Sequence, residues 1–226
     1  VYFLFYHFSF LSTTMLLLLT WELLDDTRAE TLANFGAMTE EDDAKDHGPD
    51  VKMLGRWSDL GYGRGWCVAE SSDVKAVYRW VSNWSKRNCR CTVEVVVNDD
   101  MARHILRRKF GSTDTFWSSQ YYNPGYAPEP DESLYLVSFA FNRDKVEDGF
   151  RAFASLTQAQ DTADAGDCKP LGRWHNLGKG TGVVIAAAKN SDDMQKWAAN
   201  WSTICSCNII PVLNDKDARD VLSGTN

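Results

Sequence analysis

The chain has 226 residues, enough for one large domain or two small ones, and 24% charged with 44% hydrophobic residues excludes a disordered chain and a multi-span membrane protein. A net charge of -7 argues against a nucleic-acid partner, because binding phosphates needs an excess of Lys and Arg on one face. We interpret the one dense basic run, Arg103 to Lys109, as a solvated helix end. Six cysteines without a C-x-x-C pair favour a reducing compartment, such as the cytoplasm or an organelle stroma.

Residues 1–14 carry no Lys, Arg, Asp or Glu, and with the leucines that follow they form a run long enough to suggest a membrane helix. We instead assign Leu16 to Leu23 to a strand, because Leu134 to Phe141 occupies the matching place in the second half of the chain. This leaves residues 1–14 as an apolar N-terminal extension without the basic start of a signal peptide. We expect translation to start at Met15, with a targeting segment or a short anchor as the alternatives.

The motif LGRW occurs twice, at residues 54–57 and 171–174, and similar elements surround both copies. Ahead of each copy, a strand is followed by a helical pattern, from Asp26 in one half and over Arg143 to Gln160 in the other. We expect the acidic stretch Glu40 to Asp46 to face water or to close its helix. After LGRW come a glycine-rich turn, a second strand, a helix with two tryptophans, a last strand and a short helix capped by Asn-Asp.

Each half therefore reads β-α-β-β-α-β, which is the ferredoxin-like arrangement of the α+β class. We predict two tandem units, residues 15–109 and 133–226, joined by a linker over residues 110–132. Each unit leaves one apolar sheet face bare, and the other unit is the obvious cover. The two sheets would pack face to face or curl into one shared barrel, an intramolecular pseudo-dimer. Pro211 predicts an edge or a bulge in the last strand.

The predicted linker is rich in aromatic residues, which is unusual for a solvated tether. We expect it to lie against the protein or to contact a protein partner. The aromatic residues that would do so are Phe116, Trp117, Tyr121, Tyr122 and Tyr126.

The LGRW motif, the glycine hairpin, the W-x-x-N-W helix end and the final N-D resemble the DUF3303 family, in both halves. The resemblance implies a dimeric α/β barrel, in a superfamily that contains monooxygenases, isomerase-like enzymes, haem enzymes and proteins without known chemistry. It also implies a histidine after LGRW, which the second half has as His175 and the first half replaces by Ser58. If a catalytic site exists, His175 is the candidate acid or base, with a structural role as the alternative.

The other candidate ligand-binding residues follow from the same motif. Arg56 and Arg173 could hold an anion with their planar fork, or pair with a carboxylate or a helix end. The resemblance implies that a flat aromatic ligand could lie between the helices and the sheet. Such a pocket would be lined by Trp57, Trp84, Trp174 and Trp201; the alternative is that these tryptophans pack in the core. Cys89, Cys91, Cys205 and Cys207 form two C-x-C pairs, which we interpret as buried apolar residues rather than a shared zinc site.

No complete catalytic set is recognisable in the sequence, and we assign no cofactor. The favoured interpretation is a non-catalytic interaction or assembly module, with the aromatic linker and the barrel rim as its contact surface. The alternative is a small-molecule binder or a cofactor-free enzyme that acts on an anionic or aromatic compound.

Overall fold

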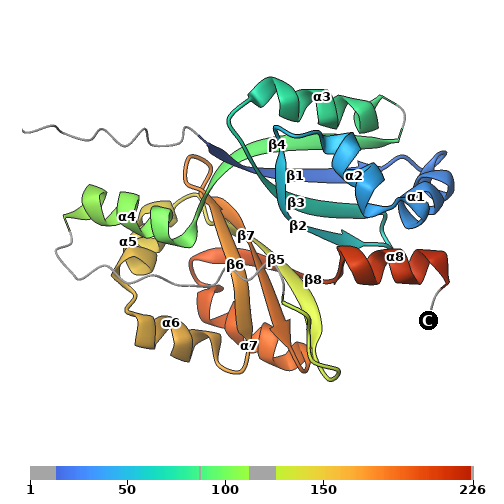
Figure 1. Cartoon of the computed structure of the whole chain (residues 1–226). Helices are drawn as coiled ribbons and strands as arrows, with labels where there is room; N and C mark the ends of the chain where they lie inside the picture. Colours follow the sequence, from blue (N-terminus) through green and yellow to red (C-terminus); the bar gives the residue numbers. More distant parts are fainter. Residues whose placement is uncertain (1–13, 87, 112–125, 225–226) are drawn as a thin grey trace, which may run out of the picture.

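The computed structural model describes residues 14–86, 88–111 and 126–224, and it contains two halves of the same design (Figure 1). The first half consists of β1 (Met15–Leu23), α1 (Arg28–Ala37), α2 (Glu40–His47), β2 (Lys52–Asp59), β3 (Arg64–Ser71), α3 (Val74–Ser85), β4 (Cys89–Asn98) and α4 (Asp99–Phe110). The second half consists of β5 (Ser133–Phe141), α5 (Val146–Ser155), α6 (Gln158–Ala165), β6 (Lys169–Asn176), β7 (Thr181–Ala188), α7 (Ser191–Trp201), β8 (Cys205–Asn214) and α8 (Asp215–Ser223).

The predicted strands and the doubled β-α-β-β-α-β pattern are confirmed, with one difference. The single helix expected before each LGRW is two helices, because Thr39 and Thr157 each start a new one with a capping box. Among the described residues, no helix has the length and apolar character that a membrane crossing requires.

The two antiparallel sheets, ordered β2-β3-β1-β4 and β6-β7-β5-β8, join at both edges into one closed barrel. Of the two arrangements expected, the shared barrel is therefore the right one. Both joints are short: β4 pairs with β6 at Val97 and Asn98, and β2 pairs with β8 at Trp57 and Ser58. Pro211 pairs with Tyr135 of β5 but lies outside the β2–β8 pairing, in agreement with its predicted edge position.

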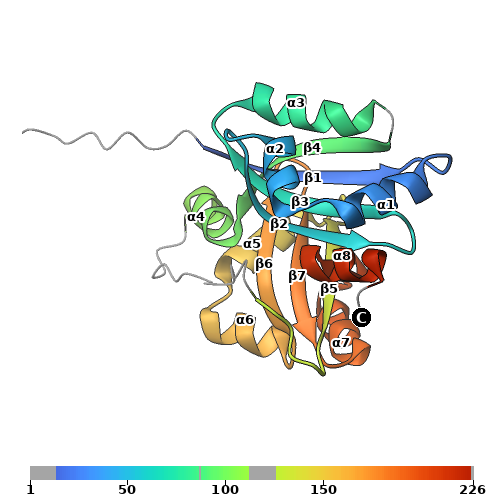
Figure 2. The ribbon, with the colours of Figure 1, turned by 45° about the vertical axis from the view of Figure 1, so that its right-hand side comes forward.

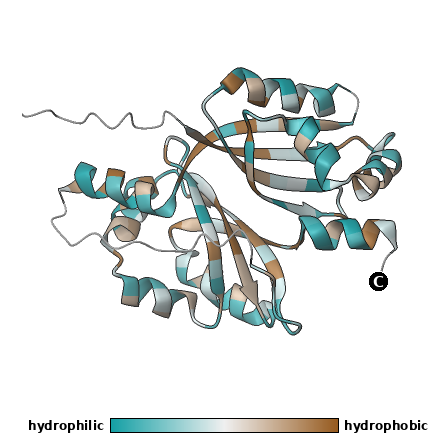
Figure 3. Ribbon diagram, in the orientation of Figure 1, coloured by the Kyte–Doolittle hydropathy of each residue, from teal (hydrophilic) through white to brown (hydrophobic). Residues whose placement is uncertain are grey.

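Apolar side chains fill three layers, one inside the barrel and one between each sheet and its helices. The inner layer includes Val68, Leu136 and Ile185, which are almost completely buried. Brown, hydrophobic positions accordingly lie along the strands, while the outer helices carry much of the teal (Figure 3). Both faces of each sheet are covered, as their two-sided apolar pattern requires.

Each half places its last helix on the other half. The helix α4 packs against α5, and α8 packs against α1, at opposite sides of the barrel (Figures 1 and 2). Arg103 and Arg107 of α4 are buried and donate to the carbonyl oxygens of Phe153 and Ala154 at the end of α5. The interpretation of this basic run as a solvated helix end is therefore wrong for these two arginines, because the exchange buries their helix face.

The structure also corrects the placement of the LGRW tryptophans. Trp57 and Trp174 do not line the space under the helices; they pack inside the barrel, with ring centroids 5.7 Å apart. A side chain at Gly55 would meet the Trp57 ring at 2.5 Å, and the same holds for Gly172 and Trp174 at 2.2 Å. The glycine of LGRW therefore makes room for its own tryptophan.

Candidate functional site

The arginines of the two LGRW copies belong to two clusters of buried charges, one at each joint between the halves. We name them the β4–β6 cluster and the β2–β8 cluster. In the β4–β6 cluster, Arg173 donates from Nε to Asp99 Oδ1 at 2.5 Å and from Nη2 to Asp161 at 3.0 Å. Arg103 of α4 donates to the same Asp99 at 3.1 Å and lies 3.4 Å from Asp161. All of these side chains are at least nine-tenths buried.

The β2–β8 cluster repeats this arrangement with equivalent residues. Arg56 donates from Nη1 and Nη2 to Asp43 at 2.9 and 2.8 Å, and from Nε to Asp215 at 2.5 Å. Arg219 of α8 donates to Asp215 at 3.2 Å and lies 3.3 Å from Asp43. Each cluster thus holds two arginines and two aspartates, one pair from each half, and their charges cancel.

Both arginines of each cluster also lie against one phenylalanine. The guanidinium groups of Arg56 and Arg219 lie 4.8 and 4.5 Å from the centre of the Phe35 ring. In the other cluster, Arg173 and Arg103 lie 5.2 and 4.1 Å from the centre of Phe153. These contacts fix the planes of the guanidinium groups and leave their fork directed at the carboxylates.

Sequence reasoning missed the aspartates that complete the clusters. The acidic stretch Glu40 to Asp46 does not simply face water, because Asp43 is buried against Arg56. Asp99 and Asp215, expected only as part of helix caps, are the first residues of helices that cross to the other half. A usable signal was present: acidic residues three positions apart, Asp43 with Asp46 and Asp161 with Asp164, recur in both halves.

Next to each cluster lies a pocket between the sheet and its helices. The first-half pocket has a cavity of about 90 Å³ and the second-half pocket one of about 60 Å³. Matching residues line them: Trp21, Phe35, Arg56, Ser58, Trp80, Trp84, Cys89 and Cys91 in the first, and Phe139, Phe153, Arg173, His175, Trp197, Trp201, Cys205 and Cys207 in the second. The structure therefore brings together most of the predicted candidates, except Trp57 and Trp174.

The two tryptophans of each pocket are held by a single carboxylate. Trp80 and Trp84 both donate their indole N–H to Asp46 Oδ2, at 2.7 and 2.5 Å. Trp197 and Trp201 donate to Asp164 Oδ2 in the same way, at 3.0 and 2.5 Å. With their only polar group satisfied, the indole rings present apolar surface to the pocket.

Electrostatics differ between the pockets, because the lining of the second includes a histidine and that of the first does not. His175 is buried between Phe139 and Phe153, with its Nε2 3.2 Å from Asp99 Oδ1. Burial lowers the pKa of His175, although the hydrogen bond to Asp99 opposes this effect. Burial alone would raise the pKa of Asp99, but the charge of Arg173 and the bond to His175 outweigh it and hold this pKa well below its usual range. His175 is therefore neutral near pH 7 and donates from Nε2 to an ionised carboxylate.

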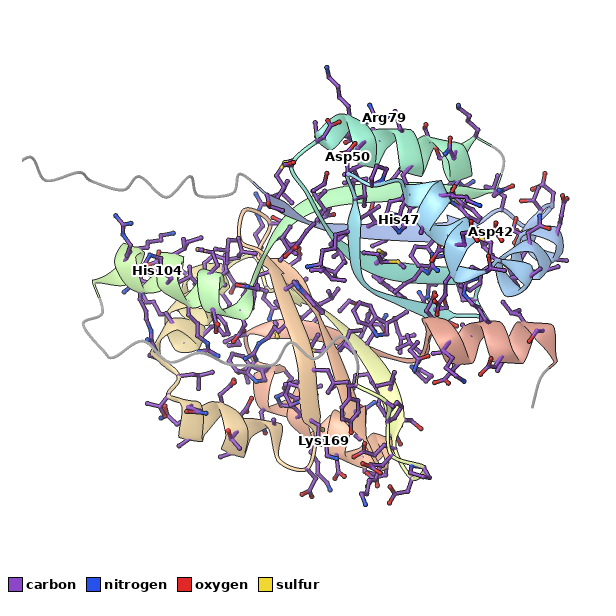
Figure 4. All side chains as sticks on the ribbon, in the orientation of Figure 1. Asp42, His47, Asp50, Arg79, His104 and Lys169 are labelled. Carbon is purple, nitrogen blue, oxygen red and sulfur yellow. The ribbon has the colours of Figure 1, made fainter. Side chains whose placement is uncertain are left out.

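Two further histidines lie outside the pockets. His47 packs edge-on against Trp80 below α3, and His104 lies on the exposed side of α4 (Figure 4). Each C-x-C pair lines its own pocket, so the four cysteines do not meet in one zinc site. Within residues 14–86, 88–111 and 126–224, no group of three or more His, Cys, Asp or Glu is placed to hold a metal ion.

A family profile described as "Domain of unknown function (DUF3303)" matches residues 15–110 and again residues 133–226. The chain belongs to this family. No curated protein is similar enough in sequence to match. The duplication and the dimeric α/β barrel that the resemblance implied are thereby confirmed.

Two solved structures are similar in fold. One, described as a "Putative Chlorite dismutase", has a TM-score of 0.52 and 10% identity, over 94% of this chain and 99% of that one. The other is a mutant chlorite dismutase from Candidatus Nitrospira defluvii in complex with cyanide, with a TM-score of 0.50 and 8% identity, over 94% of this chain and 95% of that one. At such low identity, these similarities establish the fold alone.

Proposed function

We propose that this protein binds a small, uncharged, largely apolar compound in the pockets between the helices and the sheets. The observation that carries this proposal is the duplication of the pocket. Both halves keep an apolar cavity in the same place, with matching aromatic walls, although most other residues differ. Packing alone does not require a cavity, because a void loses dispersion contacts on its lining.

The charges around the pockets support a neutral ligand over an anionic one. All three guanidinium nitrogens of Arg56 donate hydrogen bonds to Asp43 or Asp215. Arg173 donates from Nε and Nη2 to Asp99 and from Nη2 to Asp161. Because each cluster is neutral, it offers no net attraction to a carboxylate or phosphate, and burying such a group next to it would cost free energy. The anionic ligand considered from the sequence is therefore disfavoured.

The size of the cavities sets a limit on the ligand. An apolar cavity of about 150 Å³ holds benzene. The pockets, at about 90 and 60 Å³, are smaller. An aromatic ring therefore requires that a wall moves, and Trp84 and Trp201, which are only partly buried, are the walls that can do so.

The interaction module favoured from the sequence receives less support. Phe116, Trp117, Tyr121 and Tyr122 lie outside the described residues. Tyr126 packs against the barrel interior and its hydroxyl donates to Glu132, so this residue is used within the chain. The interaction module remains a prediction for the linker, and the duplicated pockets are the feature on which the present proposal rests.

The test compares toluene, phenol and benzoate, which share a ring and differ in charge. We expect toluene and phenol to raise the melting temperature and to perturb tryptophan fluorescence, with two binding sites per chain by calorimetry, and benzoate to do neither. Filling one pocket with Val81→Phe or Ala198→Phe should reduce the number of sites to one. Both residues line their pocket at a partly exposed position, so the larger ring occupies the cavity with little strain. Equal binding of benzoate, or two sites in both variants, would contradict the proposal.

A further inference from the structure

The two C-x-C pairs are the feature of the pockets that the proposed function leaves unused. Cys89 and Cys91 have their sulfur atoms 3.3 Å apart, and Cys205 and Cys207 have theirs 3.7 Å apart. All four thiols are free. In each pair, the first cysteine is buried and the second is partly exposed, so each pair extends from the pocket wall toward solvent.

Strand geometry disfavours a disulfide within either pair. Residues i and i+2 of a strand have Cα atoms about 6.6 Å apart, because a strand rises about 3.3 Å per residue. Disulfides usually join Cα atoms about 5.5–6 Å apart, and about 6.8 Å is the upper end of the usual range. An S–S bond would therefore need a Cα separation near the upper end of that range and would draw the sulfurs closer than 3.3 and 3.7 Å, whereas one atom bridging the two sulfurs leaves them where they are.

The ligands available around each pair limit which atom could bridge the two sulfurs. A tetrahedral zinc ion takes four ligands. Across the described residues, no third His, Cys, Asp or Glu is placed to join either pair. Univalent copper is satisfied by two thiolates, but a linear arrangement puts the sulfurs on opposite sides of the ion, farther apart than the 3.3 and 3.7 Å of the two pairs, and leaves a net negative charge in an apolar wall. A pyramidal centre that binds two close sulfurs and forms a neutral product fits better.

We propose that Cys89 with Cys91, and Cys205 with Cys207, are two dithiol sites for a trivalent arsenical that carries an apolar aromatic group. The balanced reaction is ArAs=O + 2 RSH → ArAs(SR)₂ + H₂O, in which two As–S bonds form, the As=O bond breaks, and the two thiol protons leave in water. No electron transfer is involved. The aryl group would lie against the apolar ring of Trp84 or Trp201, which lines the same pocket.

The ionisation of the thiols supports this reactivity. The hydrogen bond from Cys89 lowers the pKa of Cys91 and raises that of Cys89. The second pair behaves alike, with the pKa of Cys207 lowered by Cys205. The partly exposed cysteine of each pair is thus the first nucleophile, since the thiolate is the reactive form. By contrast, burial raises the pKa of the isolated Cys67 to about 12 and that of Cys168 to about 11.

The test treats the reduced full-length protein with phenylarsine oxide and washes it with excess 2-mercaptoethanol, which removes arsenic held by single thiols. Intact mass should then show two phenylarsenic groups per chain, and 2,3-dimercaptopropanol should remove both. Cys91→Ser and Cys207→Ser should each retain one group, and the double variant none. Cys168→Ser, which removes an isolated thiol, should retain two.

Two outcomes would overturn the inference: loss of all arsenic in the monothiol wash, or unchanged labelling in the double variant. The inference does not depend on the proposed function. If the cysteine variants still bind toluene, the two are separate properties of the pocket. If toluene fails while labelling persists, only the proposed function falls.

Discussion

The two joints of the barrel use the same charges in different surroundings. In the β4–β6 cluster, the side chain of Asp99 is 4% exposed and that of Arg103 is 0% exposed. In the β2–β8 cluster, the equivalent Asp215 is 32% exposed and Arg219 is 15% exposed. His175 adds a titratable ring to the first cluster, where the second has the buried Ser58. One network thus exists in a dry version and a partly hydrated version within a single chain.

The difference in exposure allows the effect of the arginine–aspartate pairing to be separated from the effect of its hydration. Both clusters link equivalent elements across the halves, β2 with α8 and β6 with α4, so the pairing of arginine with aspartate belongs to barrel closure. Water weakens ion pairs and also lowers the penalty for leaving one partner alone. The same substitution should therefore have unequal effects at the two joints, and only the dry joint should respond to pH near neutrality.

The largest expected effect comes from Asp99→Asn. It leaves Arg173 and Arg103 with a single carboxylate in a buried site, and we expect a loss of about 3–5 kcal/mol in the free energy of unfolding. Asp215→Asn should lose about 1–2 kcal/mol, because solvent reaches this group. Urea denaturation at pH 7.5 measures both. Equal losses would show that burial does not distinguish the joints.

A double variant allows the two joints to be compared even if Asp99→Asn alone fails to fold. Adding Arg173→Met removes the unpaired charge and leaves Arg103 with Asp161, which lie 3.4 Å apart. We expect the double variant to recover part of the stability, since replacing a whole ion pair costs less than breaking it. If the double variant is no more stable than Asp99→Asn, the loss of stability does not come from the unpaired charge of Arg173.

A smaller effect concerns pH. Because burial lowers the pKa of His175, the folded state holds this ring neutral while the unfolded state gains a proton below about pH 6.5. Stability is therefore complete above this pH and falls as the pH decreases toward the lowered pKa, by up to about 1.4 kcal/mol per pH unit. Asp99, whose pKa is lowered too, contributes a loss only below about pH 4.

His175→Gln keeps a donor for Asp99 and removes the titration. Urea denaturation between pH 7.5 and 4.5 should show a flatter profile for this variant than for the natural protein, with similar stability at the upper end. His104, which is exposed on α4, offers the matched control His104→Gln, which should leave the profile unchanged. If the stability of His175→Gln falls with pH as steeply as that of the natural protein, the pH dependence comes from other groups.

Much of the fold could be predicted from the sequence, because it depends on local and repeated signals. Strands such as Leu16 to Leu23 are rich in apolar residues, and the second copy supported their assignment by position. The helix exchange was not predictable in this way. Nothing local in Asp99 or Arg103 shows that α4 crosses to the other half, since a cap residue and a basic helix face have the same sequence whether exposed or buried.

The candidate site was predicted in part. Arg173 and His175 were found through LGRW, and Trp84 and Trp201 through helical spacing, and all four line the pockets. Trp57 was misplaced because the opposite face of its strand is also apolar, so alternation alone does not say which face meets helices. Asp43 and Asp161 were signalled by their repeat, but Asp99 and Asp215 are 74 and 159 residues from the arginines they pair with, and no spacing rule predicts such contacts.

The smallest expected effect is the most direct test of the comparison. Ser58→His places an imidazole at the position equivalent to His175, in the lining of the first-half pocket and in the β2–β8 joint that contains the partly exposed Asp215. Because the side chain of Asp215 is 32% exposed and that of Asp99 only 4%, the new ring should be less desolvated than His175 and add less than about 0.5 kcal/mol of pH dependence between pH 7.5 and 4.5. Urea denaturation in the His175→Gln background measures it without interference. A slope as steep as that of His175 would show that the aspartate, and not the dryness of the joint, sets the response.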